Sequence, residues 1–469
     1  MTAVSATARA RYFSASCRRR QILDISVLPD RIAPQYEKTL TSSLLSLRWP
    51  QPPRNILLMP KLHAPKVIVS AIEFAKHIHA NYPDLNLVFE SHIADTIHDA
   101  LPFPIYTTPS ANCSFHLARK VDLITTMGGD GTILRAASLF SNQNIVPPIL
   151  SFSMGTLGFL GEWKFNEYKR AWRECYMSGC PATVEDLVGP HTQASATSQL
   201  PDKEASGEEN QNIQRLSGWD RVRGNGKSMG ITRTSKILLR NRLRVGIYDS
   251  EGRNLNEQLA AVTDHYGPPQ PSADDAFSHS NAHQSISPPP LHAINEVSID
   301  RGHYPHLAII DIYVNGHHLT EAVSDGILIS TPTGSTAYSL SAGGSIVHPL
   351  VKSLLITPIS PRSLSFRPLV LPLNTQVVLK LSNRNRGREL PVSIDGKRRM
   401  GVSAGMEVRV EGESVRKTAG VWRGGVPCVI RAASKTSVNG ASEDDDSWVG
   451  GLNSLLKFNY PFGESGQGH

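Results

Sequence analysis

The stretch Met127-Gly128-Gly129-Asp130-Gly131-Thr132 decides the fold of the first half of the chain. The residues before it, from Val121 to Thr126, are apolar and β-branched, which is typical of a short buried strand. The residues after it predict a helix that begins at Ile133. Glycines between a strand and a helix let a phosphate approach the backbone, and the helix N-terminus offers it unpaired N–H groups. The stretch therefore predicts an α/β domain that holds phosphate at this turn.

Asp130 stands inside the glycine turn, where its carboxylate would face the anion that the turn is suited to hold. A negative charge among phosphate-binding donors repels the ligand unless it takes up a proton or works with Mg²⁺. Asp130 is therefore predicted to act as a general base in phosphoryl transfer. A simpler alternative stays open at this point, in which Asp130 only caps the following helix.

Short apolar runs alternate with a helical pattern through the first half of the chain. Strands are expected at 55–59, 85–90, 121–126 and 149–152, and residues 66–81 place apolar side chains at helical spacing. This alternation predicts an α/β nucleotide-binding domain, a parallel sheet with flanking helices. The prolines between residues 24 and 53 predict a lead-in segment, so the fold is expected to begin near Arg54.

The composition changes in the middle of the chain. Residues 186–230 and 250–290 are rich in Ser, Gln, Asn, Gly and Pro, which predicts two disordered insertions. From Leu291 onward, apolar runs separated by turns such as Asn315-Gly316 and Asp395-Gly396 predict a β-rich, β-sandwich-like domain. The expected organisation is a leader at 1–23, a lead-in at 24–53, an α/β domain at 54–185, an insertion at 186–230, a β-rich domain at 231–430 that contains the second insertion, and a tail at 431–469 that packs back on the body.

The overall composition points to a globular protein that binds small anions. The chain has 469 residues, of which 40% are hydrophobic, which is enough for two domain cores. No segment approaches the roughly 18 uninterrupted apolar residues of a spanning helix, so no membrane role is expected. Much of the excess behind the net charge of +7 lies in the first twenty residues, at 240–244 and at 397–399, with little aromatic interleaving, which argues against nucleic acid as a partner. Five scattered cysteines without a Cys-x-x-Cys pair predict reduced thiols in a non-secreted protein.

The N-terminus has the composition of a targeting segment. Residues 1–23 contain no Asp or Glu, and their arginines are spaced among Ala, Ser and Thr. Arg11-Tyr12-Phe13-Ser14 is similar to a presequence cleavage site. We interpret the segment as a mitochondrial transit peptide, with a disordered basic tail as the alternative.

Two further motifs lie in the second half of the chain. The run from Asp325 to Gly344 predicts a strand, a hydroxyl-rich turn and a small-residue helix, a surface on which a polyhydroxylated ligand can lie close to the backbone. Asn295 and Glu296 stand side by side and are suited to a ribose diol or an adenine edge. A Ser/Thr-rich turn and the cap of a strand edge are the structural alternatives for these two motifs.

The ordered set of motifs resembles the NAD kinase family. The set consists of Gly128-Gly129-Asp130-Gly131-Thr132, Asn295-Glu296, the 325–344 run, Ser363-Leu364-Ser365-Phe366-Arg367-Pro368 and Ser393-Ile394-Asp395-Gly396. The resemblance spans roughly residues 54 to 430 apart from the insertions. The glycine motif also occurs in lipid kinases and phosphofructokinases, whereas the 325–344 run is highly specific. The leader and Trp163-Lys164-Phe165 resemble the fungal mitochondrial branch that favours NADH.

The resemblance implies phosphorylation of the 2′-hydroxyl of the adenosine ribose of NADH or NAD⁺ by ATP with Mg²⁺, in the mitochondrial matrix. It also implies a homo-oligomer and no resident metal ligand. Asp130 would take the proton, and Gly129, Gly131 and Thr132 would hold the donor phosphates and Mg²⁺. Asn295 and Glu296 would read adenosine, Asp325 would face the nicotinamide amide, and Thr336, Ala337, Tyr338 and, more weakly, Ser341 would line the dinucleotide pocket.

Two other functions compete with this interpretation. A lipid kinase shares the glycine loop, but its acceptor needs an apolar channel, whereas residues 331–341 are polar and small. A silent dinucleotide-binding regulator has no use for the carboxylate of Asp130. The two insertions depart from the pattern of the NAD kinase family, so the family's contacts are not carried over to those loops.

Overall fold

The fold is taken from a computed structural model of the chain. The structure describes residues 22–39, 42–82, 84–108, 113–155, 158–161, 163–181, 218–224, 234–256, 291–418 and 420–431, together with Trp448, Leu452 and Leu456. Most of the predicted leader, of both predicted insertions and of the predicted tail lies outside these residues. In the tail, Arg431 forms an ion pair with Glu167 at 3.0 Å, and the ring of Trp448 packs edge-on against His348 with 4.6 Å between the centroids.

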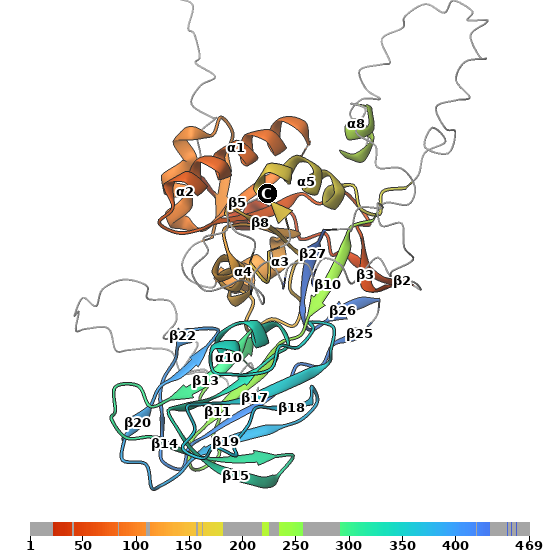
Figure 1. Cartoon of the computed structure of the whole chain (residues 1–469). Coiled ribbons are helices and arrows are strands. Elements are labelled where there is room, and N and C mark those ends of the chain that lie inside the picture. Colours follow the sequence, from red (N-terminus) through yellow and green to blue (C-terminus); the bar gives the residue numbers. More distant parts are fainter. Residues whose placement is uncertain are drawn as a thin grey trace, which may run out of the picture.

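An eleven-stranded mixed sheet forms the first part of the molecule (Figure 1). Its parallel centre has the order β6-β5-β4-β7-β8. These strands are β4 (Asn55–Pro60), β5 (Asn86–Phe89), β6 (Ile105–Thr107), β7 (Leu123–Met127) and β8 (Ile149–Ser153), and the short β9 (Trp163–Lys164) pairs with β8. The predicted parallel sheet is confirmed. Strand order reverses between β4 and β7, and in such sheets ligands bind outside the carboxyl ends of the strands at that point.

Helices cover both faces of this sheet. On one face, α1 (Pro65–Asn81), α2 (Ser91–Ile97) and α5 (Tyr168–Tyr176) pack into a core with Phe74, Trp172 and Phe152. On the other face, α3 (Cys113–Lys120) and α4 (Asp130–Ser138) pack through Leu117, Ile133 and Ala136. The spacing of the buried side chains explains α1, which begins with a proline at its first turn. In Figure 1, α3 and α4 lie on the side of the sheet that faces the second domain.

The segment before Arg54 contributes three strands to the sheet, so the expectation that the fold begins near Arg54 is wrong. β1 (Ile22–Asp24) pairs with β6 at one edge, and β2 (Gln35–Thr39) and β3 (Ser42–Arg48) extend the opposite edge through β10. The prolines concealed this pattern, because each lies between strands and not within one. Residues 44–47 and Trp49 are all buried.

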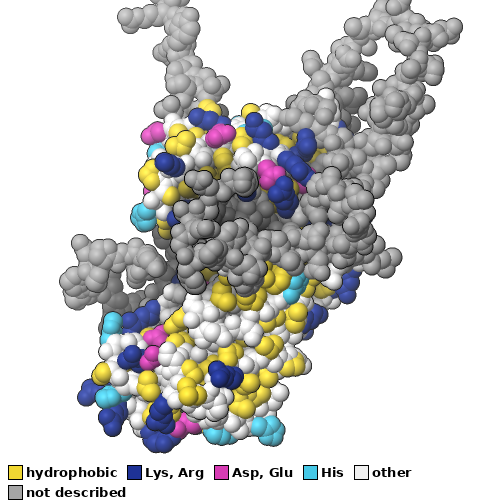
Figure 2. All heavy atoms as spheres, in the orientation of Figure 1, with side chains coloured by type: hydrophobic (Ala, Val, Ile, Leu, Met, Phe, Trp, Pro, Cys, Tyr) yellow, Lys and Arg dark blue, Asp and Glu magenta, His cyan; other side chains and the backbone are white. Residues whose placement is uncertain are grey.

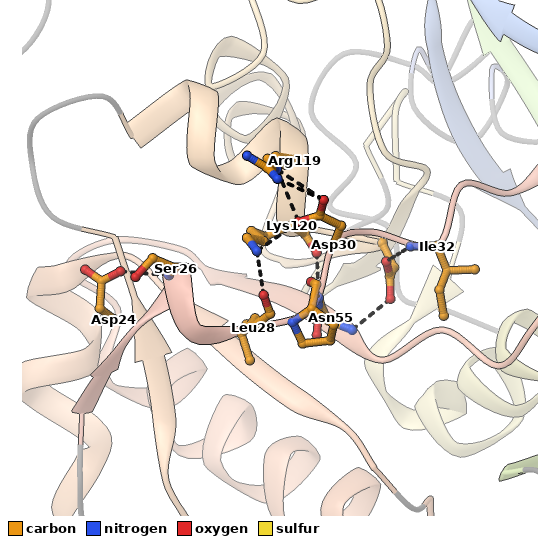
Figure 3. Close-up of polar contacts among 10 residues, drawn as sticks. Asp24, Ser26, Leu28, Asp30, Ile32, Asn55, Arg119 and Lys120 are labelled. Carbon is orange, nitrogen blue, oxygen red and sulfur yellow. Dashed lines mark hydrogen bonds and ion pairs between the residues drawn. The ribbon is translucent and has the colours of Figure 1, made fainter.

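Polar contacts tie this N-terminal segment to the domain (Figure 3). The buried carboxylate of Asp122 accepts from the backbone N–H groups of Ile32, Arg54 and Asn55 at 2.5, 2.6 and 2.9 Å. The side-chain amide of Asn55 donates to the carbonyl of Pro29, and Lys120 donates to the carbonyl of Leu28. Asp30 forms an exposed ion pair with Arg119 and with Lys120.

Two six-stranded antiparallel sheets form the second part of the molecule (lower half of Figure 1). One has the order β12 (Leu291–Ala293), β11 (Leu243–Tyr248), β24 (Glu407–Gly412), β19 (Val377–Leu381), β14 (Ala308–Val314) and β15 (His317–Ser324). The other has the order β18 (Leu369–Pro372), β17 (Ser353–Ile359), β16 (Gly326–Ser330), β13 (Glu296–Asp300), β21 (Val392–Ile394) and β22 (Lys397–Arg398). Side chains of both sheets share one apolar core, which confirms the predicted β-rich sandwich.

Two strands from the second half of the sequence belong to the first sheet. β10 (Lys236–Arg240) and β27 (Val426–Ile430) pair with each other, and β27 also pairs with β8. The chain thus crosses between the parts at 240–243 and again between Gly412 and Trp422, whose indole N–H donates to the Tyr36 carbonyl of β2 at 2.9 Å. These two crossings connect the second domain to the first sheet. Two two-residue turns predicted from the sequence are confirmed, because Asn315-Gly316 and Asp395-Gly396 both have positive φ between paired strands.

The remaining described elements are small. They are the strand pairs β20 (Glu389–Leu390) with β23 (Val402–Ser403) and β25 (Arg416–Thr418) with β26 (Val421–Arg423), the helices α8 (Gly218–Gly224) and α10 (Tyr338–Ser341), and the 3-10 turns η2 (Ile25–Val27), η3 (His98–Ala100), η4 (Phe165–Glu167) and η8 (Thr333–Thr336). Over the described ranges, no helix is both long and apolar enough to cross a membrane.

Candidate functional site

Asp130 follows the β7 strand after Gly128 and Gly129 and is the first residue of α4, so this helix begins three residues before the predicted Ile133. Its carboxylate accepts two backbone hydrogen bonds from a neighbouring turn, from Phe159 N–H to Oδ2 at 2.9 Å and from Leu160 N–H to Oδ1 at 3.1 Å. A carboxylate has about four lone-pair positions, so both oxygens can still accept from a ligand. Asp130 makes no side-chain cap to its own helix, which removes the capping role as its explanation.

The glycines of the loop leave open space beside this carboxylate. A β-carbon built on Gly129 or on Gly131 meets no described atom within 4 Å. Gly128 is different, because its φ is +157° and a β-carbon on it would lie 2.3 Å from the hydroxyl oxygen of Thr132, which leaves no room for a side chain. Thr132 is therefore buried behind the loop, while Gly129 and Gly131 form its exposed rim.

The second domain brings Asn295 and Glu296 to the start of β13, both nearly buried. Asp395, in the β21–β22 turn, accepts from the backbone N–H groups of Ile294, Asn295 and Glu296 at 2.9, 2.7 and 3.2 Å. Burial, and then the charge of Asp395, raise the pKa of Glu296 to about 8. Oδ1 of Asn295 and Oε2 of Glu296 are buried without a hydrogen-bond partner among the described residues. Such atoms are costly unless a ligand satisfies them.

The hydroxyl-rich run folds as predicted into β16, the turn η8 and the short helix α10. Gly334 lies against Asn295, because a β-carbon on it would be 2.1 Å from the Asn295 carbonyl oxygen. The Thr336 hydroxyl donates to the Thr333 carbonyl at 3.1 Å. Thr336 and Ala337 are half-buried, whereas Tyr338 and Ser341 are exposed. The run therefore presents a polar rim next to the Asn295-Glu296 pair.

Asp325 lies at the β15–β16 corner and forms an ion pair with Arg301, 2.6 Å from Nε to Oδ1. Tyr338 is electrostatically coupled to this corner. Burial raises the pKa of the Tyr338 phenol, and Asp300, Asp325 and Glu296 add to the rise. The structure thus brings Asp325, Tyr338 and Glu296 into one electrostatic neighbourhood. Arg301, which holds the Asp325 carboxylate, was not singled out in the sequence.

Basic side chains from both domains meet along α4. Nζ of Lys397 donates to the hydroxyl of Ser138 at 2.6 Å. Arg135 forms an ion pair with Glu90 at 2.9 Å and donates to the Pro60 carbonyl at 2.6 Å, at the carboxyl end of β4. Burial lowers the pKa of Lys397, and the charges of Arg399 and Arg135 lower it further. Mutual repulsion of this kind is relieved when an anion binds.

Phe159, Leu160, Asp395, Lys397 and Arg135 have no role assigned from the sequence. Asp395 and Lys397 carried a signal, because the Asp395-Gly396 turn was part of the resemblance and residues 397–399 were among the basic positions that favour small anions. The backbone donors of Phe159 and Leu160 have no sequence signature, since any residue supplies an N–H group. Among the described residues, His, Cys, Asp and Glu side chains form no group of three or more suited to a metal ion.

Comparisons with known proteins agree with this geometry. Residues 79–179 match the ATP-NAD kinase N-terminal domain, and residues 294–419 match the ATP-NAD kinase C-terminal domain. The chain is 33% identical over 449 residues to a mitochondrial NADH kinase of Schizosaccharomyces pombe, covering 94% of this chain and 86% of the relative. It is 29% identical over 450 residues to a mitochondrial NADH kinase of Saccharomyces cerevisiae, covering 90% and 84%.

A solved structure, yeast NADH kinase complexed with NADH, superposes with a TM-score of 0.65 at 29% identity and covers 94% of this chain and 98% of that one. The N-terminal family match contains the Asp130 loop, and the C-terminal family match includes Ile294 to Asp395. Over most of its length, in sequence and in fold, this chain belongs to the ATP-NAD kinase family.

Proposed function

We propose that the protein transfers the terminal phosphoryl group of ATP to the 2′-hydroxyl of the adenosine ribose of NADH or NAD⁺. The observation that carries this proposal is the Asp130 carboxylate, held by two N–H groups beside the open rim of Gly129 and Gly131. This arrangement supports the role of Asp130 as a general base that is fixed beside a loop able to hold phosphate. Phosphoryl transfer asks mainly for such positioning and for charge stabilisation.

In this mechanism the acceptor lies against the second domain. The unsatisfied Oδ1 of Asn295 and Oε2 of Glu296 would receive the adenosine, and the rim of Thr336, Ala337 and Tyr338 would line the rest of the dinucleotide. The 2′-hydroxyl would point at Asp130, which takes its proton as the oxygen attacks the terminal phosphorus. Ser341, exposed at the end of α10, would contribute at the edge of the pocket.

The donor would enter as the MgATP complex. Mg²⁺ bound by substrate phosphates needs few protein ligands, which leaves the Asp130 carboxylate free to act as the base. Thr132, buried behind the loop, would fix the shape of the cradle. The cations that meet along α4, Lys397, Arg399 and Arg135, would attract the phosphates at the point where strand order reverses.

We infer a preference for NADH from the names of the relatives and from the corner at Asp325. Its carboxylate is paired with Arg301, so it offers no uncompensated charge to the cationic ring of NAD⁺. The test is purified protein with ATP, Mg²⁺ and either NADH or NAD⁺, with the product read by an NADP-specific dehydrogenase. Equal kcat/KM with both acceptors would remove the preference, and activity with neither would remove the function.

Two relatives, the NADH kinases of Schizosaccharomyces pombe and Saccharomyces cerevisiae, are named as mitochondrial, and we propose import of this chain into the matrix, directed by residues 1–20. Deletion of residues 1–20 is expected to leave the protein in the cytosol. A truncated protein that still fractionates with mitochondria would contradict this proposal.

Self-association is proposed from the surface of the second domain. Figure 2 shows hydrophobic side chains spread over the visible face of this half, and exposed large ones include Leu319, Val370 and Leu364, the last 85% exposed. A pocket of about 300 Å³ lies nearby between residues 319–323 and 361–369. Light scattering of Leu364→Asp against wild type tests the proposal, with a smaller particle expected for the variant. An unchanged mass would place the contact elsewhere or exclude it.

A further inference from the structure

Arg240 is a fully buried cation without a counter-ion among the described residues. It ends β10, it is 2% exposed, and no ion pair of its guanidinium is formed with a described carboxylate. Its Nε has no hydrogen-bond partner within the described ranges. A buried charge is normally paired, because removing it from water costs several kcal/mol after relaxation. Arg242, two residues further on, shows the usual solution, a bidentate ion pair with Glu413.

The guanidinium of Arg240 reaches the two loops that the proposed reaction uses. Nη2 donates to the carbonyl of Phe159 at 3.5 Å, and Nη1 donates to the Thr333 hydroxyl at 3.4 Å. Phe159 belongs to the turn that holds Asp130, and Thr333 opens the turn beside Asn295. One side chain therefore touches both halves of the site.

A single peptide group connects Arg240 to Asp130. The carbonyl of Phe159 accepts from Arg240, and the N–H of the same peptide group, which is that of Leu160, donates to Oδ1 of Asp130 at 3.1 Å. A cation at the carbonyl end polarises such a peptide and strengthens its N–H as a donor. Arg240 thus acts on the proposed base through the polarised peptide group, without direct contact.

The backbone beneath Arg240 gives this connection a fixed origin. Arg240 pairs with Val426 of β27, inside the mixed sheet, and its carbonyl oxygen would lie 3.0 Å from a β-carbon on Gly425. The side chain therefore starts from a rigid strand and ends at two loops.

We propose that Arg240 is a positioning residue, which holds the Asp130 carboxylate through the Phe159–Leu160 peptide and keeps it in register with the Thr333 turn. This inference rests on the proposed function, since it assigns Arg240 a role in that reaction. The unpaired buried charge then lowers the stability of the fold but orders the active site, a common trade-off between stability and activity.

The test compares Arg240→Met and Arg240→Lys with wild type, using ATP and NADH. Methionine fills the space without the charge, and it is expected to lower kcat on the order of 10- to 100-fold while KM for NADH changes by less than about 3-fold. Its Tm is expected to equal or exceed that of wild type, because an unpaired buried charge is removed. Lysine keeps the charge but not the fork that reaches both loops, so an intermediate kcat is expected. Arg244→Met, at an exposed arginine of β11, is the matched control and should retain wild-type kcat.

A second arm repeats both substitutions in an Asp130→Asn background. If Arg240 acts through Asp130, the losses do not multiply, and each double variant is within about 3-fold of Asp130→Asn alone. If Arg240→Met does not fold, the comparison of Arg240→Lys in the wild-type and Asp130→Asn backgrounds still tests whether Arg240 acts through Asp130. A kcat for Arg240→Met within about 3-fold of wild type, a lowered Tm with normal kcat, or full multiplication in the double variants would each overturn the inference. Wild-type protein that phosphorylates neither dinucleotide would instead refute the proposed function and, with it, this role.

Discussion

Gly158 lies so close to Asp130 that a β-carbon on the glycine would be 2.1 Å from Oδ1 and 2.8 Å from Oδ2 of the carboxylate. The turn can donate its N–H groups to Asp130 only while residue 158 has no side chain. Gly158→Ala is therefore expected to displace the carboxylate and to lower kcat on the order of 10²-fold, since misplacement by about 1 Å has that effect. Steady-state kinetics with ATP and NADH measure it.

The neighbouring Gly155 provides a matched control for that substitution. A β-carbon on Gly155 meets no described atom within 4 Å, so Gly155→Ala is expected to keep wild-type kcat and Tm. If Gly158→Ala retained full turnover, the Asp130 carboxylate would not need the position that the turn imposes on it.

Asp130→Asn removes the proposed base and keeps its size. Asparagine cannot accept a proton at neutral pH, and loss of a general base typically lowers kcat by about 10²- to 10⁴-fold, roughly 3 to 5 kcal/mol of barrier. The affinity for NADH is expected to change little, because Asn295, Glu296 and the 333–338 turn remain. Fluorescence titration with NADH separates binding from turnover. Turnover within a few-fold of wild type would place the base elsewhere.

Lys397→Met tests whether the cations along α4 attract the donor. Loss of one half-buried charge opposite a polyphosphate is expected to raise KM for ATP about 5- to 10-fold and to leave KM for NADH within about 2-fold. The control is Lys380→Met, because the ammonium of Lys380 on β19 is more exposed and lies near Glu407. A rise confined to KM for NADH would assign Lys397 to the acceptor and not to the donor.

The spacing of apolar residues was sufficient to predict a helix or a strand wherever that element buries one regular face. The strands β4, β5, β7 and β8, the helix α1 and the β14–β15 turn at Asn315-Gly316 follow from apolar spacing and turn chemistry alone. The N-terminal strands did not, because β1 and β2 are short and prolines stand between the elements. Their burial depends on pairing with β6 and with β10, which are distant in the sequence.

The same distinction applies to the site. Asp130, Asn295 and Glu296 could be singled out from the sequence because the glycine turn and the Asn-Glu pair stand in the order of the NAD kinase motifs, and their roles stay predictions. The N–H groups of Phe159 and Leu160, and the charge of Arg240, could not, since their roles come from tertiary placement around the Asp130 carboxylate. A buried arginine at a strand end has no local pattern that marks it.

Glu296→Gln is expected to change how stability depends on pH. Burial and Asp395 raise the pKa of Glu296 from 4.5 to about 8, so the folded protein holds this proton more tightly than the unfolded chain. The resulting stabilisation is complete below about pH 4.5 and is lost as the pH rises through about 8. Glutamine stays neutral, so the variant should exceed wild type in stability at pH 8.5 by on the order of 1 to 4 kcal/mol.

Urea unfolding of the ligand-free protein at pH 5.5 and pH 8.5 measures the difference for Glu296→Gln. Glu251→Gln, at an exposed carboxylate, should follow the wild-type dependence at both values. Parallel stability curves for wild type and Glu296→Gln would show that the carboxylate is not held neutral in the unliganded protein.

Asp122→Ala tests whether the N-terminal segment is an integral part of the α/β domain. Asp122 is fully buried, and its two oxygens satisfy three backbone donors, one of them from Ile32 in that segment. Removal leaves these donors unpaired, at about 1 to 3 kcal/mol each before relaxation, so a loss of roughly 3 to 5 kcal/mol in unfolding free energy is expected. Asp30→Ala, which removes an exposed ion pair of the same cluster, should leave the unfolding free energy close to that of wild type. Equal losses for the two variants would show that the segment adds only surface contacts and that the domain is stable without it.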